Sequence, residues 1–160
     1  MLVAGPPFGV EDRLKVLIDQ LAAVVAVWER ALAGLETAVA RRDAALSQAE
    51  VRLRSALHGM TLRRWRSLVS GKAAVRSSAD GRALALARRL APAVEAALGD
   101  LEGLRAARAR DLWPAQEVLA VAAAGLLRYG PAAEAASGRP VAELRRMARS
   151  PNRPGPSVDG

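Results

Sequence analysis

The feature that most constrains the fold is a hydrophobic repeat in the first third of the chain. Apolar side chains recur at alternating intervals of three and four residues from Leu14 to Ala56, and Arg42 is the only polar side chain in the series. A strict period of 3.5 residues keeps one seam of a helix buried against a neighbouring helix. We therefore expect one long helix of the coiled-coil type, from about Val10 to His58. The seam positions are Leu14, Ile18, Leu21, Val25, Trp28, Leu32, Leu35, Val39, Arg42, Leu46, Ala49, Leu53 and Ala56.

A second repeat of the same kind lies in the later half of the chain. From Ala83 apolar residues return at the 3-4 spacing and continue past Pro114 to Tyr129. A proline in a helix interior costs about 3 kcal/mol, so we expect this arm, which spans about 82–128, to kink or restart at Pro114. Its length nearly matches that of the first helix. The two repeats predict an all-α fold, a long antiparallel coiled-coil helical hairpin.

The apolar face of the first helix is wider than a two-helix contact requires. Residues that flank the seam at seven-residue intervals are also apolar, among them Leu17, Val24 and Ala31. A face three positions wide contacts more than one neighbouring helix. We therefore expect self-association into a homo-oligomeric bundle. The expected oligomer interface comprises Leu17, Val24, Trp28, Leu98 and Leu119.

Glycine, proline and serine residues divide the chain into segments. Between the two arms we expect a short amphipathic helix over 61–70 and a loop over 71–81, in which Asp80 caps the second arm. Two short helical stretches follow the hairpin, and the proline-rich end of the chain cannot form a helix. The expected division is a flexible N-terminus at 1–10, the hairpin at 11–129 with its basic tip at 58–91, a small helical cap at 130–149 and a disordered tail at 150–160.

Composition excludes several classes of protein. Hydrophobic residues make up 51% of the 160-residue chain, enough for a folded core. No cysteine is present, which excludes disulfides, a thiol nucleophile and metal sites held by sulfur. The most apolar stretches fall short of the roughly 20 residues that span a bilayer, and the N-terminus does not look like a leader. We expect a soluble, cytoplasmic protein without a transmembrane segment.

The net charge of +8 is concentrated in one short stretch. Residues 58–91 contain eight basic residues and one acidic residue, Asp80, whereas basic and acidic residues nearly balance elsewhere. A compact basic cluster is the pattern expected of a surface that binds nucleic-acid phosphates, because each neutralised phosphate releases counterions. The predicted nucleic-acid-binding residues are Arg63, Arg64, Arg66, Lys72, Arg76, Arg82, Arg88 and Arg89.

The cluster has other interpretations that the sequence leaves open. These arginines can pair with the acidic residues that recur from Glu29 to Glu50, bind an acidic protein or an anionic membrane, or form a solvated surface. Trp65, which lies among them, is suited to stacking on a base. Its spacing from Leu62 and Leu68 equally suits an apolar anchor for the short helix.

Three further features also carry competing interpretations. Residues 130–149 have the outline of a helix-turn-helix, but Glu134 and Pro140 depart from that motif, which favours a plain helical cap. Arg42 either sets the register of an oligomer or extends past small neighbours to solvent. His58 is the only histidine, and the chain offers no cysteine or second histidine with which it can share a metal.

These features favour a binding protein over an enzyme. No phosphate-binding glycine loop, catalytic triad or separate carboxylate pair is found, so we expect no catalytic residue, cofactor or metal. The favoured function is a non-enzymatic coiled-coil protein that binds the phosphate backbone of DNA or RNA through its basic tip, with low sequence specificity. The alternative is an assembly, scaffold or adaptor protein whose apolar faces bind partner helices. No motif ties the chain to a particular family.

Overall fold

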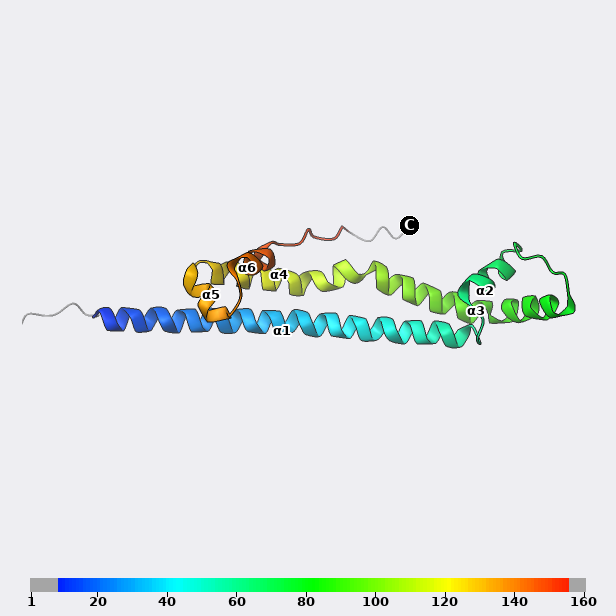
Figure 1. Ribbon diagram of the computed structural model, residues 1–160, viewed down its shortest axis with the longest axis horizontal. Coiled ribbons are helices and arrows are strands. Elements are labelled where there is room, and N and C mark those ends of the chain that lie inside the picture. Colours follow the sequence, from blue (N-terminus) through cyan, green and yellow to red (C-terminus); the bar gives the residue numbers. More distant parts are fainter. Residues whose placement is uncertain (1–8, 156–160) are drawn as a thin grey trace, which may run out of the picture. The chain divides into compact units, whose positions relative to one another are not determined.

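The computed structural model describes residues 9–155, and within that range the regular secondary structure is entirely helical, with no strand (Figure 1). This confirms the predicted all-α class. The helices are α1 (Val10–Ala56), α2 (Leu62–Val69), α3 (Ser78–Ala106), α4 (Arg108–Leu127), α5 (Pro131–Ser137) and α6 (Val141–Ala148). None of these helices combines the length and the apolar character that crossing a membrane requires.

The helices form two compact units. Unit 1 consists of the chain up to Val39 together with the chain from Ala109, and unit 2 is the segment Ala40–Arg108. The long helix α1 contributes to both, because its residues before Ala40 belong to unit 1 and the rest belong to unit 2. Each unit has an apolar core of its own.

Local signals in the sequence set both ends of α1. Glu11 and Asp12 place negative charge in the first turn, where the helix dipole favours it. After Ala56 the backbone enters the left-handed region, with φ of 49° at His58 and 81° at Gly59. A left-handed residue is a common end for a helix, so α1 stops within two residues of the predicted position.

In unit 2 the second half of α1 shares one core with α2 and α3. The buried residues include Leu53 of α1, Leu68 of α2 and Val94 of α3. Trp65 of α2 is only 5% exposed, and its indole N–H donates a hydrogen bond to the backbone carbonyl of Ala87 at 3.0 Å. The indole therefore anchors α2 on α3, as the apolar-anchor interpretation of Trp65 requires.

The second arm does not restart at Pro114, which was one of the two expected outcomes. The structure ends α3 at Ala106 and begins α4 at Arg108, whereas Pro114 lies inside α4. Pro114 is exposed, so its ring and the helical carbonyl that loses an amide donor lie at the helix surface, where water is available. The cost of the proline is therefore low enough for α4 to continue through it.

Arg42 binds the C-terminal end of α3. The guanidinium of this buried residue donates a hydrogen bond to the backbone carbonyl of Leu104, in the last turn of the helix. Carbonyls in the last turn lack an amide partner within their own helix, and a cation there complements the negative end of the helix dipole. Arg42 therefore fixes the alignment of α1 against α3 within unit 2, while a role in oligomer register stays a prediction.

In unit 1 the first half of α1 shares a second core with α4, α5 and α6. Trp28, Leu126, Ala133 and Leu144 are buried in it, one from each of these helices in chain order. The helices α5 and α6 correspond to the two short stretches expected within 130–149, and Figure 1 shows them folded beside α4. They cap the core of unit 1.

Within unit 1, two arginine–tryptophan contacts join the segments that follow α5 and α6 to α1 and α4. Arg139, between α5 and α6, lies 5.8 Å from the ring centroid of Trp28, and Arg153 lies 5.5 Å from that of Trp113. Trp113 also donates its indole N–H to the carbonyl of Pro151 at 3.3 Å. The predicted tail is thus in contact with α4 over part of its length. Residues 156–160 of that tail, and residues 1–8 of the predicted flexible N-terminus, lie outside the described residues.

Most of the predicted seam on α1 is covered within its own unit. From Leu21 to Ala56 every seam position is buried or half-buried, whereas Leu14 and Ile18 are 56% and 57% exposed. The apolar stripe of α1 is therefore open to solvent over its first turns. The complete coiled-coil hairpin and the oligomer remain predictions.

Replacing Leu68 by alanine is expected to lower the free energy of unfolding by about 2–5 kcal/mol, because the side chain is 3% exposed in the core of unit 2. The neighbouring Val69 is 38% exposed, so Val69→Ala is expected to change the free energy of unfolding by less than about 0.5 kcal/mol. Urea unfolding followed by circular dichroism measures both. Equal effects of the two substitutions would contradict the described packing of α2.

Arg42→Met is expected to lower the free energy of unfolding by about 1–3 kcal/mol, because the Leu104 carbonyl loses its donor while most of the aliphatic stem is kept. Arg41 is exposed, and Arg41→Met serves as the matched control with a change of less than about 0.5 kcal/mol. The same unfolding measurement applies. An Arg42→Met variant that is as stable as the native chain would sink the capping role.

Candidate nucleic-acid interface

The two units differ sharply in charge. Unit 2 contains fourteen basic and six acidic residues, a net charge of +8, which equals the net charge of the whole chain. Unit 1 contains ten basic and ten acidic residues and has no net charge. Any attraction of anions by net charge therefore comes from unit 2.

All eight predicted phosphate-binding residues are exposed on unit 2. Three lie on α2, two lie in the loop that joins α2 to α3, and three lie in the first half of α3. In that order they are Arg63, Arg64 and Arg66, then Lys72 and Arg76, then Arg82, Arg88 and Arg89. Within residues 9–155 only Arg64 of this set forms an ion pair.

The amphipathic pattern of α2 explains why its arginines are exposed. Thr61 caps the helix, since its hydroxyl oxygen accepts the backbone N–H of Arg64 at 3.1 Å. Trp65 and Leu68 then occupy the side that faces the core. Arginines at the intervening positions are left on the solvent side, because residues three or four apart share one face of a helix.

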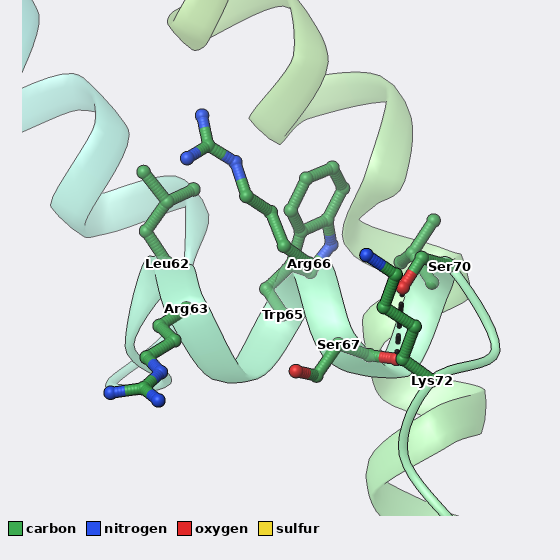
Figure 2. Close-up of a pocket in the computed structure, with 8 residues that line it drawn as sticks. Leu62, Arg63, Trp65, Arg66, Ser67, Ser70 and Lys72 are labelled. Carbon is green, nitrogen blue, oxygen red and sulfur yellow. Dashed lines mark hydrogen bonds between the residues drawn. The ribbon is translucent and has the colours of Figure 1, made fainter.

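An open depression of about 770 Å³ lies along α2 and the start of the following loop. Arg63, Arg66 and Lys72 line it together with the largely buried Trp65. Figure 2 shows the guanidinium groups of Arg63 and Arg66 pointing in opposite directions from α2. The cations therefore surround the depression instead of meeting at one point, an arrangement that fits a row of phosphates better than one small anion.

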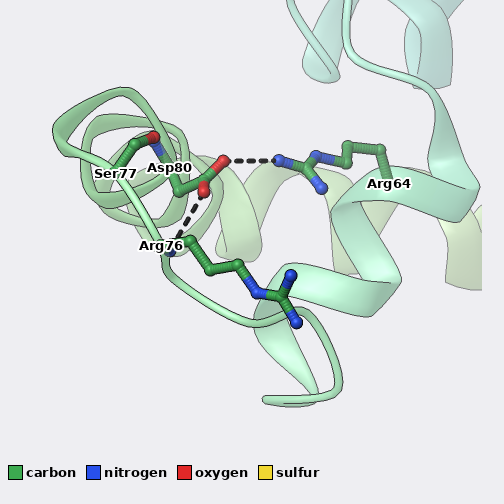
Figure 3. Close-up of polar contacts among 4 residues, drawn as sticks. All are labelled: Arg64, Arg76, Ser77 and Asp80. Carbon is green, nitrogen blue, oxygen red and sulfur yellow. Dashed lines mark hydrogen bonds and ion pairs between the residues drawn. The ribbon is translucent and has the colours of Figure 1, made fainter.

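Asp80 organises the loop before α3 (Figure 3). Its carboxylate accepts the backbone N–H of Arg76 at 3.1 Å and the guanidinium of Arg64 at 3.3 Å. The N-cap of α3 is Ser77, whose hydroxyl oxygen accepts the N–H of Asp80 at 3.2 Å. The prediction that Asp80 caps the helix is therefore wrong, because Asp80 lies in the first turn and its carboxylate binds the residue before the cap.

These contacts lower the pKa of Asp80 below its ordinary value of 3.8. The largest cause is the hydrogen bond from the backbone N–H of Arg76, and Ser77 and the Arg64 guanidinium add to it. The carboxylate is therefore ionised at neutral pH. Arg64 consequently contributes less to an external anion than the other members of the set.

Glu50, an acidic residue of α1 in unit 2, forms an ion pair with an arginine that is not one of the eight predicted phosphate-binding residues. Glu50 lies 3.8 Å from the guanidinium of Arg105 of α3, and both side chains are substantially exposed. Such a pair contributes less than about 1 kcal/mol. The contact leaves the predicted basic residues available to an external partner.

Sequence reasoning missed a second basic group in unit 2. Arg54 and Arg105 line a depression of about 540 Å³ together with Arg66, which also lines the first one. Glu50 and Glu102 line the same depression and offset most of its charge. Counting charge along the chain does not reveal this group, because Arg54 and Arg105 come from segments that are close to neutral.

The predicted oligomer-interface residues have different environments. Leu17 is exposed, and Val24 and Leu98 are half-buried. Trp28 and Leu119 are 3% and 5% exposed because both belong to the core of unit 1. Trp28 and Leu119 are therefore not available at the described surface, and an oligomer interface there would use other side chains.

The described part of the chain offers no cluster of metal-binding side chains. Residues 9–155 contain no group of three or more histidine, aspartate or glutamate side chains able to hold a metal ion.

Comparison with known proteins found no similarity: no family model matches the chain, no curated protein matches its sequence and no solved structure matches its fold. Any functional interpretation of the basic surface of unit 2 therefore depends on the residues of this chain alone.

Asp80→Asn is expected to destabilise unit 2 at neutral pH and to have no effect in acid. Because the folded-state pKa lies below the unfolded value, the ionised carboxylate stabilises the fold fully above 3.8, and this stabilisation is lost as the pH falls through the folded-state pKa. Urea midpoints of both proteins across a pH series measure the difference. Asp100→Asn, at an exposed position of α3, is the control. A difference in urea midpoint between Asp80→Asn and the native chain that persists unchanged in acid would rule out the electrostatic explanation.

Proposed function

We propose that the protein is a non-enzymatic nucleic-acid-binding protein that contacts the phosphate backbone through unit 2. The observation that carries the proposal is the placement of the eight exposed basic residues on the unit that holds the whole net charge of the chain. Seven of the eight form no ion pair within residues 9–155. Their charge is therefore available to an external polyanion.

The type and spacing of these cations support a phosphate ligand. Seven of the eight are arginines, and the guanidinium group can donate two parallel hydrogen bonds to one phosphate. They extend over α2, the following loop and α3, so that a single strand or one side of a duplex can engage several at once. Release of counterions from each neutralised phosphate supplies the affinity.

The same surface offers little for reading bases. Trp65 is the only tryptophan, tyrosine or phenylalanine of unit 2, and its burial and its hydrogen bond to Ala87 remove it from base stacking. The helix α2 has eight residues and packs on α3, so it does not project as a recognition helix. We therefore propose binding of low sequence specificity, with the antiparallel coiled-coil hairpin as a rigid support for the basic tip.

Reversing the charge of Arg63, Arg66 and Lys72 to glutamate is expected to abolish most of the binding. Fluorescence anisotropy with a labelled duplex, across a salt series, measures it. For the native chain we expect affinity to fall steeply with salt, and for the variant we expect the slope of log affinity against log salt to flatten by about 3. Circular dichroism checks that the variant keeps its helices.

The control reverses the charge of three exposed basic residues of unit 1, Arg145, Arg146 and Arg149. Both triple variants have the same net charge, so the comparison separates a localised interface from attraction by total charge. Loss of binding in the unit 2 variant alone supports the proposal. Equal loss in both variants, or no binding of the native chain at low salt, would overturn it.

A further inference from the structure

The basic surface of unit 2 lacks the exposed aromatic rings that hold single strands. Proteins that bind single-stranded nucleic acid combine a basic groove with side chains on which bases stack, and each stacked base raises affinity about fivefold to a hundredfold. Residues 40–108 are all described, and their only tryptophan, tyrosine or phenylalanine is Trp65, which is 5% exposed. A single strand therefore finds no exposed ring of these types on unit 2.

The one histidine of unit 2 does not replace such a ring. His58 is exposed at the end of α1, and its Nδ1 lies 2.9 Å from the backbone carbonyl oxygen of Ser55, within hydrogen-bond distance. This contact holds the imidazole against its own helix end. His58 is also absent from the residues that line the depression along α2.

The segments that carry the cations are fixed to one another. Trp65 binds α2 to α3 through the carbonyl of Ala87. Asp80 of α3 accepts the Arg64 guanidinium of α2 at 3.3 Å and the backbone N–H of Arg76 in the loop at 3.1 Å. Figure 3 shows the Arg76 side chain extending away from this carboxylate. The basic residues of α2, the loop and α3 therefore form one array that is set before a ligand arrives.

The outer side of α3 is suited to lie close to a straight phosphate backbone. Arg82 and Arg89 are seven residues apart, so they share one side of the helix and are separated by about 10 Å along its axis. This side faces away from Ala87 and Val94, which are buried in the core of unit 2. Ala85 is exposed between the two arginines and contributes only a methyl group there.

A duplex matches a fixed array of cations better than a single strand does. It carries one negative charge per about 1.7 Å of its axis, and each neutralised phosphate releases more counterions from a duplex than from a single strand. Its persistence length is about 150 base pairs, so it is already straight over a short site. A single strand loses chain freedom when it is held along such an array, and unit 2 offers no stacking ring that would compensate.

We propose that the ligand of unit 2 is a double-stranded nucleic acid, bound along one side through its phosphates, in preference to a single strand. This inference rests on the proposed function, because it specifies which polyanion the same surface selects. Two observations carry it together. Seven of the eight predicted basic residues are exposed and form no ion pair within residues 9–155, and no tryptophan, tyrosine or phenylalanine ring is exposed among residues 40–108.

Fluorescence anisotropy of the full chain with a short mixed-sequence DNA duplex, and with each of its separate strands, tests the preference. We expect the duplex to bind at least about tenfold more tightly than either strand at about 0.1 M salt. A difference of about 0.2 per contact in salt slope gives this ratio for about five contacts, relative to equal binding at 1 M. Single strands that bind as tightly as the duplex overturn this inference but leave the proposed function standing, whereas no binding of any probe overturns both.

An added aromatic ring tests the cause of the preference. Val69 is 38% exposed and lines the depression with Arg63 and Arg66, so Val69→Trp places a stacking side chain among these cations. We expect this variant to bind the single strands at least about fivefold more tightly than the native chain does, which reduces the preference for the duplex.

Val51→Trp, at an exposed position of α1 in the same unit but outside that depression, is the matched control and is expected to change neither affinity. Circular dichroism checks that both variants keep their helices. A folded Val69→Trp variant without tighter single-strand binding, or with no more than the control shows, overturns the inference that the missing ring sets the preference.

Discussion

Burial of one continuous apolar stripe along α1 is the interaction on which the rest of the structure depends. A helix of 47 residues has little support from its own hydrogen bonds in water and needs other helices along its length. In unit 2 the stripe packs on α2 and α3 around Leu53, and in unit 1 it packs on α4, α5 and α6 around Trp28. Each unit therefore depends on its own part of the same helix.

Once the stripe is buried, the placement of charge follows. Trp65 and Leu68 hold the apolar side of α2 in the core of unit 2, so Arg63, Arg64 and Arg66 lie on the exposed side of this helix. Asp80 closes the loop between the two helices and compensates one of these cations, Arg64. Unit 2 is left with a dispersed set of available cations, and unit 1 is left neutral with exposed apolar residues.

Periodicity and local capping signals were sufficient to predict the helical class and most helix ends, because these depend on neighbouring residues. The break between α3 and α4 was not predictable, since it coincides with a bond from Arg42, which is 62 residues away from Leu104. The basic surface was visible as a charge imbalance within 58–91, but the pairing of Arg64 with Asp80 requires the folded loop. The exposure of Leu14 and Ile18 likewise depends on where α4 stops, which the heptads do not encode.

The most direct test of the central claim, that unit 2 alone engages phosphates, is a residue-resolved map of binding. Amide chemical shifts of the isotope-labelled full chain, titrated with a short DNA duplex at low salt, report each contacting backbone segment. We expect changes concentrated from Arg63 to Arg89, decreasing as salt is added, with those of α5 and α6 unchanged. Changes centred on unit 1, or changes spread evenly over both units, would contradict the account.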